Sequence, residues 1–185
     1  MFARKDITPD VLRQLLECCF DTGKLYWKKR DVGWFHSERS SRAWNKRYAG
    51  REAFTYVDVG GYHCGHVLGY RLYAHRVVFA MYHGEWPDRF IDHENGCKTD
   101  NRPSNLRDVS RAENARNTVR PSDNSSGFIG VHWAQREGKW RACIGLGPGQ
   151  SLYLGSFAEL EDAVRARKDA EKRFGFHPNH GRPSD

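Results

Sequence analysis

The stretch FIDHENGCKTDNRPSNLRDVSRAENARN, residues 90–117, constrains the fold of this chain more than any other. It reads as a strand, a polar loop rich in Gly, Asn and Asp, a second strand and a short helix. Ser110 followed three residues later by Glu113 is a capping-box signature, so the helix is predicted to begin there. This order of elements should bring three polar side chains within reach of one point: Asp92, His93 and Asn114.

These three side chains suit the hydrolysis of a phosphodiester. The carboxylate of Asp92 and the amide oxygen of Asn114 are hard donors, which favour a divalent cation such as Mg²⁺. The imidazole of His93 beside them can take a proton from water at neutral pH. A metal, a base and a strongly basic chain together indicate phosphodiester hydrolysis.

The stretch resembles the H-N-H endonuclease motif, in the branch found in phage and intron-associated homing enzymes. In that branch an acid–His pair is followed by Asn-Leu and then by a metal-binding Asn on a helix. These places are held here by Asp92-His93, Asn105-Leu106 and Asn114. The resemblance implies an α+β fold with a ββα-metal domain, in which Asp92 and Asn114 hold one divalent metal, His93 is the general base and Asn105 pins the loop that aims it. It further implies Mg²⁺, with Mn²⁺ as the second choice, a hairpin and helix pressed into the minor groove, and products with 5′-phosphate and 3′-hydroxyl ends.

The net charge of +7 is concentrated in one segment. Residues 24–51 hold nine Lys or Arg against two acids, which equals the excess of the whole chain. Aromatic residues lie among these cations, and this pattern favours contact with nucleic acid. The alternative is a solvated, partly disordered basic loop with no fixed partner. The cations predicted to contact DNA are Lys28, Lys29, Arg30, Arg42, Lys46 and Arg47.

The five cysteines predict no structural zinc site. No C-x-x-C pair is present, and His63-Cys64-His66 has no second ligand pair at matching spacing, so it is interpreted as an ordinary strand or hairpin. The thiols are expected to be reduced, which indicates an intracellular, cytoplasmic protein. The sequence has no apolar run of signal-peptide or membrane-spanning length, so neither export nor membrane insertion is expected.

Local signals predict the elements that precede the motif. Thr8 before Pro9 is a helix start, with Thr8 as the N-cap. From there the predicted elements are a helix over residues 8–19, a strand from Leu25 into the basic segment, a hairpin of strands 53–59 and 62–68 joined at Gly60-Gly61, and a helix over residues 72–83.

The helix over residues 72–83 carries Ala74-His75-Arg76 near its start, a sequence that often opens this helix in the same nuclease branch. One interpretation places His75 or Arg76 near the scissile phosphate. The other makes His75 a packing or capping residue against the hairpin of the motif. His75 and Arg76 are also predicted DNA contacts, as is Arg116 on the motif's helix, which is predicted over residues 110–117.

A second domain is predicted after a linker. Residues 119–126 are rich in Pro, Ser, Asp and Asn, and strands over residues 128–133, 139–146 and 151–155 follow them. Ser156 with Glu159 predicts the start of a helix that Gly175 ends. The predicted organisation is a nuclease domain over residues 1–118, a linker over 119–126, a three-stranded antiparallel sheet with one helix over 127–178, and a tail over 179–185.

The pieces SGFIGVHW, GKWRACI and YLGSFAELEDAVRARKDA resemble the DNA-binding domain of plant ethylene-response factors, which places its sheet in the major groove. The resemblance covers Ser126 to about Phe174 and is weaker in the first hairpin. It implies contact with DNA by residues of the sheet. The candidates are His132, Trp133, Arg136, Lys139, Trp140, Arg141 and Tyr153, with burial under the helix as the alternative for either tryptophan.

The leading hypothesis is a metal-dependent endonuclease of homing or nicking type, encoded by a phage or prophage. It would act on double-stranded DNA as a monomer or a homodimer, since one H-N-H site cuts one strand per visit. A DNA-binding regulator with an inactive nuclease motif is a second class, against which the intact motif residues argue. An RNA-binding or RNA-cutting protein is a third class, which the basic aromatic segment would serve equally well.

Overall fold

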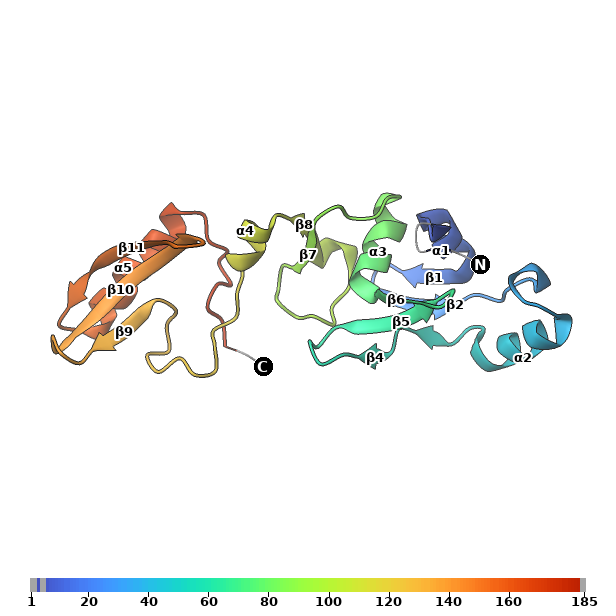
Figure 1. The fold of residues 1–185 in the computed structure, drawn as a ribbon, viewed down its shortest axis with the longest axis horizontal. Coiled ribbons are helices and arrows are strands. Elements are labelled where there is room, and N and C mark those ends of the chain that lie inside the picture. Colours follow the sequence, from blue (N-terminus) through green and yellow to red (C-terminus); the bar gives the residue numbers. More distant parts are fainter. Residues whose placement is uncertain (1–2, 4–5, 184–185) are drawn as a thin grey trace. The chain divides into compact units, whose positions relative to one another are not determined.

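The chain forms two compact units in a computed structural model that describes residues 3 and 6–183. The first unit runs to Asp108 and the second begins at Val109, whereas the predicted nuclease domain ended at residue 118. Both units combine helices with small sheets, so the fold is a mixed α/β one (Figure 1).

The first unit builds its helices around small sheets (Figure 1). Its helices are α1 (Pro9–Leu15), α2 (Glu38–Tyr48) and α3 (Ala74–His83), with 3₁₀ turns η2 (Val32–Trp34) and η3 (Pro103–Asn105). Its strands are β1 (Leu16–Cys19), β2 (Lys24–Trp27), β3 (Glu52–Ala53), β4 (Tyr56–Val57), β5 (His63–Val67), β6 (Tyr70–Tyr73), β7 (Phe90–His93) and β8 (Leu106–Val109). They pair in the orders β1-β2-β3, β4-β5-β6 and β7-β8.

The core of the first unit lies where α1 packs against α3. Leu12 and Leu15 of α1 and Val77 and Val78 of α3 have no exposed surface. Thr8 caps α1, since its Oγ1 accepts a hydrogen bond from a backbone N–H of the first turn. The predicted helix start is therefore confirmed, and burial of apolar positions three or four residues apart fixes the two helices together.

Two predicted helix boundaries are wrong, because the residues next to them pair in β-strands instead. The helix predicted to Cys19 ends at Leu15, since β1 pairs antiparallel with β2. The helix predicted from Leu72 begins at Ala74, since Leu72 lies opposite Gly65 in the hairpin of β5 and β6. The hairpin predicted at Gly60-Gly61 is confirmed, because β4 and β5 pair antiparallel on either side of it.

Helix α2 was not predicted at all. The strand predicted from Leu25 was expected to run on into the basic segment. Residues 38–48 of that segment form a helix instead. Its sequence, ERSSRAWNKRY, offers only Ala43, Trp44 and Tyr48 as apolar positions, which is a weak helical period. Hydrogen bonds between the side chain of Asn45 and the backbone of Arg30 hold it in place.

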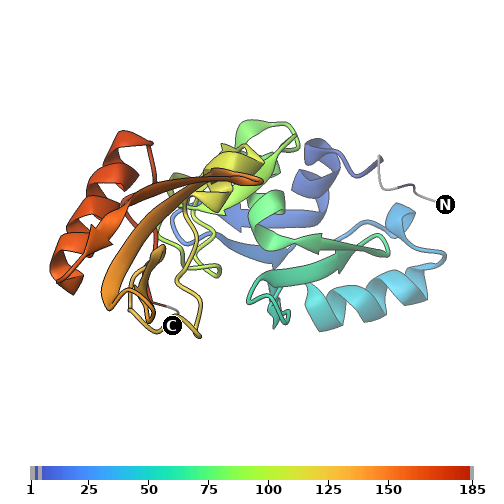
Figure 2. The same cartoon turned by 60° about the vertical axis from the view of Figure 1, so that its left-hand side comes forward.

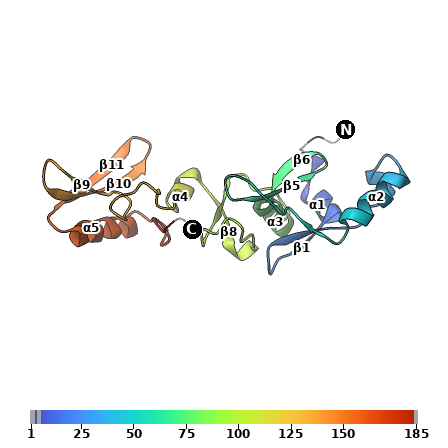
Figure 3. The same cartoon turned by 90° about the horizontal axis from the view of Figure 1, so that it is seen from below.

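The second unit holds α4 (Arg111–Ala115), β9 (Val131–Ala134), β10 (Lys139–Gly147), β11 (Gln150–Phe157) and α5 (Leu160–Arg173). Its strands form an antiparallel sheet in the order β11-β10-β9. Helix α5 lies along one face of this sheet, which Figure 2 shows from one side and Figure 3 from another. Val131, Ala142 and Ala163 form the small buried core between the two layers.

The capping box predicted at Ser156 and Glu159 is wrong. Ser156 lies in β11 opposite Arg141, and its hydroxyl hydrogen-bonds to Glu137 and to Tyr153. The N-cap of α5 is Glu159, which makes no capping hydrogen bond through its side chain. Ser156 therefore belongs to the sheet and does not cap the helix. The predicted end of the helix is confirmed, since α5 stops at Arg173, shortly before Gly175.

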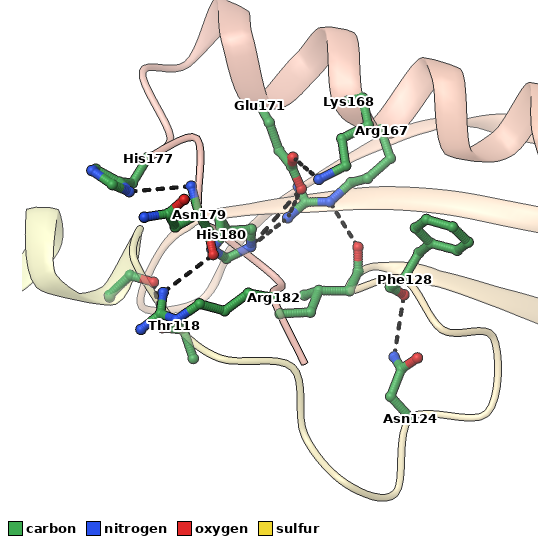
Figure 4. Close-up of polar contacts among 12 residues, drawn as sticks. Thr118, Asn124, Phe128, Arg167, Lys168, Glu171, His177, Asn179, His180 and Arg182 are labelled. Carbon is green, nitrogen blue, oxygen red and sulfur yellow. Dashed lines mark hydrogen bonds and ion pairs between the residues drawn. The ribbon is translucent and has the colours of Figure 1, made fainter. Parts of the chain in front are cut away.

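The C-terminal segment, predicted as a tail, folds back along the second unit (Figure 4). The guanidinium of Arg167 donates to the backbone oxygen of Ile129 (2.8 Å) and to Nε2 of His180 (3.1 Å), and it faces Glu171 at 3.4 Å. Burial lowers the pKa of His180, in keeping with a neutral ring that accepts from Arg167. The N–H of Gly181 donates to the oxygen of Thr118 (2.9 Å). Segments at both ends of the unit are therefore joined by hydrogen bonds.

Candidate active site

The two-stranded sheet of β7 and β8 carries the predicted acid and base. Asp92 and His93 end β7 and are both buried, with 8% and 4% of their surface exposed. Ile91 and Leu106, one on each strand, anchor the sheet in the apolar core of the first unit. The predicted acid and base are thus held on a strand whose orientation is fixed by its apolar residue Ile91.

Asn105 closes the loop between the two strands. Its Oδ1 accepts a hydrogen bond from the N–H of Asn95 (2.9 Å), and its Nδ2 donates to the oxygen of Asp100 (2.8 Å). Its backbone oxygen accepts from the N–H of Glu94, the residue after His93. One buried residue, through its side-chain amide and its backbone oxygen, therefore fixes three points of the loop that follows the predicted base.

Asn101 is the direct partner of His93, and sequence reasoning missed it. Nε2 of His93 lies 3.1 Å from Oδ1 of Asn101, a side chain that is only 2% exposed. Because an amide oxygen can only accept, Nε2 must carry the proton, which leaves Nδ1 as the basic nitrogen. The turn at Gly23 packs on Asn101 so closely that a Cβ there would lie 2.3 Å from its backbone carbon.

Burial lowers the pKa of His93, while its hydrogen bond to Asn101 and the nearby charge of Asp92 act in the opposite direction. A lowered pKa keeps the imidazole neutral at pH 7. A neutral imidazole of fixed tautomer is the form that a general base requires.

Asp92 forms an ion pair that the sequence did not predict. Its Oδ2 lies 2.5 Å from Nη2 of Arg107, which is on β8. The guanidinium provides a hydrogen-bonding counter-charge for a carboxylate that is nearly out of water. Alternation along the second strand could have suggested Arg107, two residues after Asn105.

His75 packs against His93 within an aromatic cluster. Its ring centroid lies 5.3 Å from that of His93, 5.2 Å from Tyr62 and 5.5 Å from Tyr73. Its Nδ1 is buried and has no hydrogen-bond partner among the described residues. Burial, with smaller contributions from His93 and Arg76, lowers the pKa of His75 to about 3. These are the contacts of a packing residue, which was one of the two interpretations of His75.

The remaining residues of the predicted site lie in different surroundings. Arg76 donates to the backbone oxygens of Pro87 and Arg89, so its guanidinium ties down the chain after α3. Asn114 lies on α4 in the second unit, where both hydrogen bonds of the predicted capping box at Ser110 are present. The capping prediction is therefore confirmed, and the role of Asn114 stays a prediction.

The predicted DNA contacts of the first unit divide into two groups. Lys28, Lys29, Arg42, Lys46 and Arg47 are exposed. Arg30 is half-buried, and its guanidinium lies 3.9 Å from the ring centroid of Trp44 and 4.9 Å from that of Trp27. Its side chain is thus engaged inside the unit.

In the second unit the sheet has an open face and a face covered by α5. Arg141 pairs with His132 and with Ser156, and Cys143 pairs with Tyr153, on the face opposite the buried Ala142. Lys139 shares this open face by strand alternation, and Arg136 is exposed in the turn before it. Trp133 and Trp140 pair with each other on the other face, where Trp140 packs on the core. Arg116 lies with its guanidinium 5.7 Å from the ring of Phe176.

Two features are absent from the described part of the chain. No group of three or more His, Cys, Asp and Glu side chains gathers within residues 3 and 6–183. The predicted site, with one acid, one histidine and one amide, is not of that type. No helix in this part of the chain is long and apolar enough to cross a membrane.

Comparison with known proteins identifies one family. Residues 72–116, about a quarter of the chain, match a family model described as HNH endonuclease. No curated protein and no solved structure matches the chain. The matched segment contains Asp92, His93, Asn105 and Asn114, and also His75. The match supports an HNH nuclease domain in this segment, and with it a nuclease that acts on nucleic acid.

Proposed function

We propose that the chain is a metal-dependent endonuclease that hydrolyses phosphodiester bonds of double-stranded DNA. The observation that carries the proposal is His93, a buried histidine of lowered pKa whose Nε2 is held by Asn101. It follows Asp92, whose carboxylate pairs with Arg107, and it lies within the segment that matches HNH endonucleases. A fixed, neutral imidazole next to an acid is what water activation at a phosphate needs.

In this proposal His93 takes the proton of the attacking water at Nδ1. Asn101 holds the ring in the tautomer that leaves Nδ1 basic, and Asn105 keeps the loop that carries Asn101 in place. A well-placed general base contributes about 10²–10⁴-fold to the rate. Loss of the imidazole should therefore remove at least about two decades of rate and leave DNA binding intact.

Asp92 and Asn114 would hold the divalent cation. On the side of Asp92 the chain offers a buried carboxylate, whose Oδ2 pairs with Arg107. Carboxylate and amide oxygens are hard donors that suit Mg²⁺, with Mn²⁺ as the second choice. When bound, such a cation stabilises the negative charge that develops on the phosphate and on the leaving oxygen.

The DNA would be held by basic surfaces of both units. On the second unit we propose the face of the sheet opposite α5, which carries cations and a tyrosine. The side chains concerned are His132, Arg136, Lys139, Arg141 and Tyr153. Trp133 and Trp140 are left out of this surface, since the register places them on the side of α5.

The biological setting follows from the same proposal. An enzyme with one such site nicks one strand per visit, and two copies would be required to cut both strands at once. We propose a homing or nicking enzyme of a phage or prophage, acting inside the host cell as a monomer or homodimer.

The test is nicking of a supercoiled plasmid by the full chain with Mg²⁺ and with EDTA. The native chain should nick only with the metal, His93→Ala should lose at least about a hundredfold in rate, and the exposed change His66→Ala should nick normally. DNA affinity is measured for all three in EDTA. Absence of metal-dependent nicking by the native chain, or equal loss of binding and cleavage in His93→Ala, would contradict the proposal.

A further inference from the structure

Helix α2 is a complete, capped helix within the basic segment. Oγ of Ser37 accepts a hydrogen bond from the N–H of Ser40 (3.2 Å) at its start. Glu38 lies in its first turn and Lys46 and Arg47 in its last, which complements the helix dipole. Its eleven residues span about 16 Å at the usual rise. The segment is therefore a stable element and not a solvated loop.

The inner face of α2 is fixed to the chain before it by polar contacts. Oδ1 of Asn45 accepts from the N–H of Arg30 (2.9 Å), and Nδ2 of Asn45 donates to the oxygen of the same residue (2.8 Å). Ser41 is 7% exposed and donates to that oxygen as well (3.4 Å). A pair of hydrogen bonds from one amide fixes both the distance and the rotation of the helix.

An aromatic cluster completes the attachment. The ring of Trp44 lies 5.7 Å from Trp27 and 5.8 Å from Phe35, and the guanidinium of Arg30 stacks on it. Burial lowers the pKa of Arg30 to about 10, so the side chain is still a cation at neutral pH and attracts both indole faces. The large side chains of Trp27, Phe35 and Trp44 therefore pack against one another on the inner side of α2.

The outer face of α2 is basic and carries no large apolar side chain. Helical spacing places Arg39, Arg42 and Lys46 along one ridge, with Ala43 beside them, and all four are exposed. The single acid near this ridge, Glu38, pairs with Arg42 at 3.5 Å. Because both side chains are mostly in water, this ion pair contributes little to stability. A protein partner would need an apolar centre on this face, and there is none.

We propose that α2 is a recognition helix that lies in the major groove of double-stranded DNA and contacts it through Arg39, Arg42 and Lys46. An α-helix is about 10–12 Å wide and the major groove of B-DNA is about 12 Å wide, so a cationic ridge with a small residue beside it can enter. The major groove of an RNA duplex is too deep and narrow for side chains to read, which excludes it as the partner. The inference rests on the proposed function only in taking DNA as the substrate.

The place of α2 in its own unit supports a role apart from cleavage. It lies at the far end of the first unit from β7, which carries Asp92 and His93 (Figures 1 and 3). Base pairs contacted by α2 would therefore be displaced from the phosphate that is cut. Such a helix would give the nuclease a fixed distance between the site it reads and the site it cleaves.

The test selects duplexes from a random-sequence DNA library with the full chain carrying His93→Ala, in EDTA. The same selection uses this chain with Arg39→Gln, Arg42→Gln and Lys46→Gln together. The matched control removes three exposed cations of α5, with Arg165→Gln, Lys172→Gln and Arg173→Gln. For each chain the selected base pairs, the affinity at several salt concentrations and the protection of guanine N7 from methylation are measured.

We expect the α2 variant to lose one contiguous block of selected base pairs, with its N7 protection, while the α5 control retains it. Affinity should fall roughly 10- to 100-fold, and the dependence of log K on log salt should become shallower by about 2–3. The single change Lys46→Gln, with a slope change of about one, shows the same effect in a chain whose folding is least perturbed. Circular dichroism and tryptophan fluorescence confirm that each variant is folded.

An unchanged block and unchanged affinity in the α2 variant would overturn the inference. So would stronger competition by a structured RNA than by the selected duplex at one salt concentration. Because all binding is measured without metal in a His93→Ala chain, the outcome is separate from the plasmid assay. If the native chain never nicks DNA but the block depends on α2, the nuclease proposal fails and this inference stands.

Discussion

Acid should destabilise the first unit through His75, and the structure gives the size of the effect. The ring is 8% exposed, and burial lowers its pKa from an ordinary 6.5 to about 3. The folded state therefore binds fewer protons than the unfolded state between these two values. Stability is complete above about pH 6.5 and is lost progressively as the pH falls towards 3. At pH 5 protonation of the unfolded chain at this one residue lowers the free energy of unfolding by about 2 kcal/mol.

The measurement compares the native chain with His75→Phe, which keeps an aromatic ring against Tyr62 and Tyr73 and removes the titrating group. Urea unfolding is followed by hydrogen exchange of the α3 peptides, so that only the first unit is observed. Between about pH 7.5 and about pH 5 the native chain should lose about 2 kcal/mol more than the variant. The matched exposed change His66→Phe should lose as much as the native chain.

The reasoning is refuted if native and His75→Phe chains lose the same stability over this range. His93, whose pKa is also lowered by burial, makes a further loss of the same sign in both chains. The range stops near pH 5 so that carboxyl groups contribute little.

Three further changes test the supports of each unit. Gly23→Ala should destabilise the first unit by more than the roughly 1–3 kcal/mol of a strained backbone, because φ is +70° and the new Cβ would meet the backbone of Asn101 at 2.3 Å; a thermal midpoint equal to that of the native chain would refute this. Asn105→Ala should cost about 1–3 kcal/mol and slow nicking, since it leaves two loop backbone groups without partners; normal nicking would show that the loop does not depend on it. Arg167→Met should cost about 3–5 kcal/mol in the second unit, because it leaves the buried carboxylate of Glu171 without this cation. The loss is measured by chemical denaturation with hydrogen exchange of the α5 peptides. A smaller loss would contradict the prediction and would mean that Lys168 alone is a sufficient partner for Glu171.

The segment that carries the site was predictable because its signals are local. The capping box of Ser110 and Glu113 and the helix start at Thr8 depend on residues three apart or adjacent, and both are present in the structure. The pair Asp92-His93 and the Asn105 that follows also stand in a short stretch of sequence. Residue types at linked spacings were sufficient to select them, and the match over residues 72–116 covers the same stretch.

Helix α2 could not be predicted from periodicity. Its inner face is held by the amide of Asn45 and by stacking of Trp44 on Arg30, and neither contact produces an apolar repeat. Composition marked the segment as basic and aromatic, and could not distinguish a helix from a solvated loop. Polar attachment to an earlier part of the chain decided between these alternatives.

The sequence by itself determined the nuclease motif, the hairpin and the helix ends marked by Thr8, Ser110 and Gly175, because each of these follows from neighbouring residues. Tertiary structure alone decided the surroundings of the base: Asn101 as its partner, Arg107 opposite Asp92, and His75 packed against its ring. It also removed Ser156 from the predicted capping box, since pairing with Arg141 holds that serine in β11. Such contacts join residues far apart in the chain, and their energies depend on burial and distance, which exist only once the chain has folded.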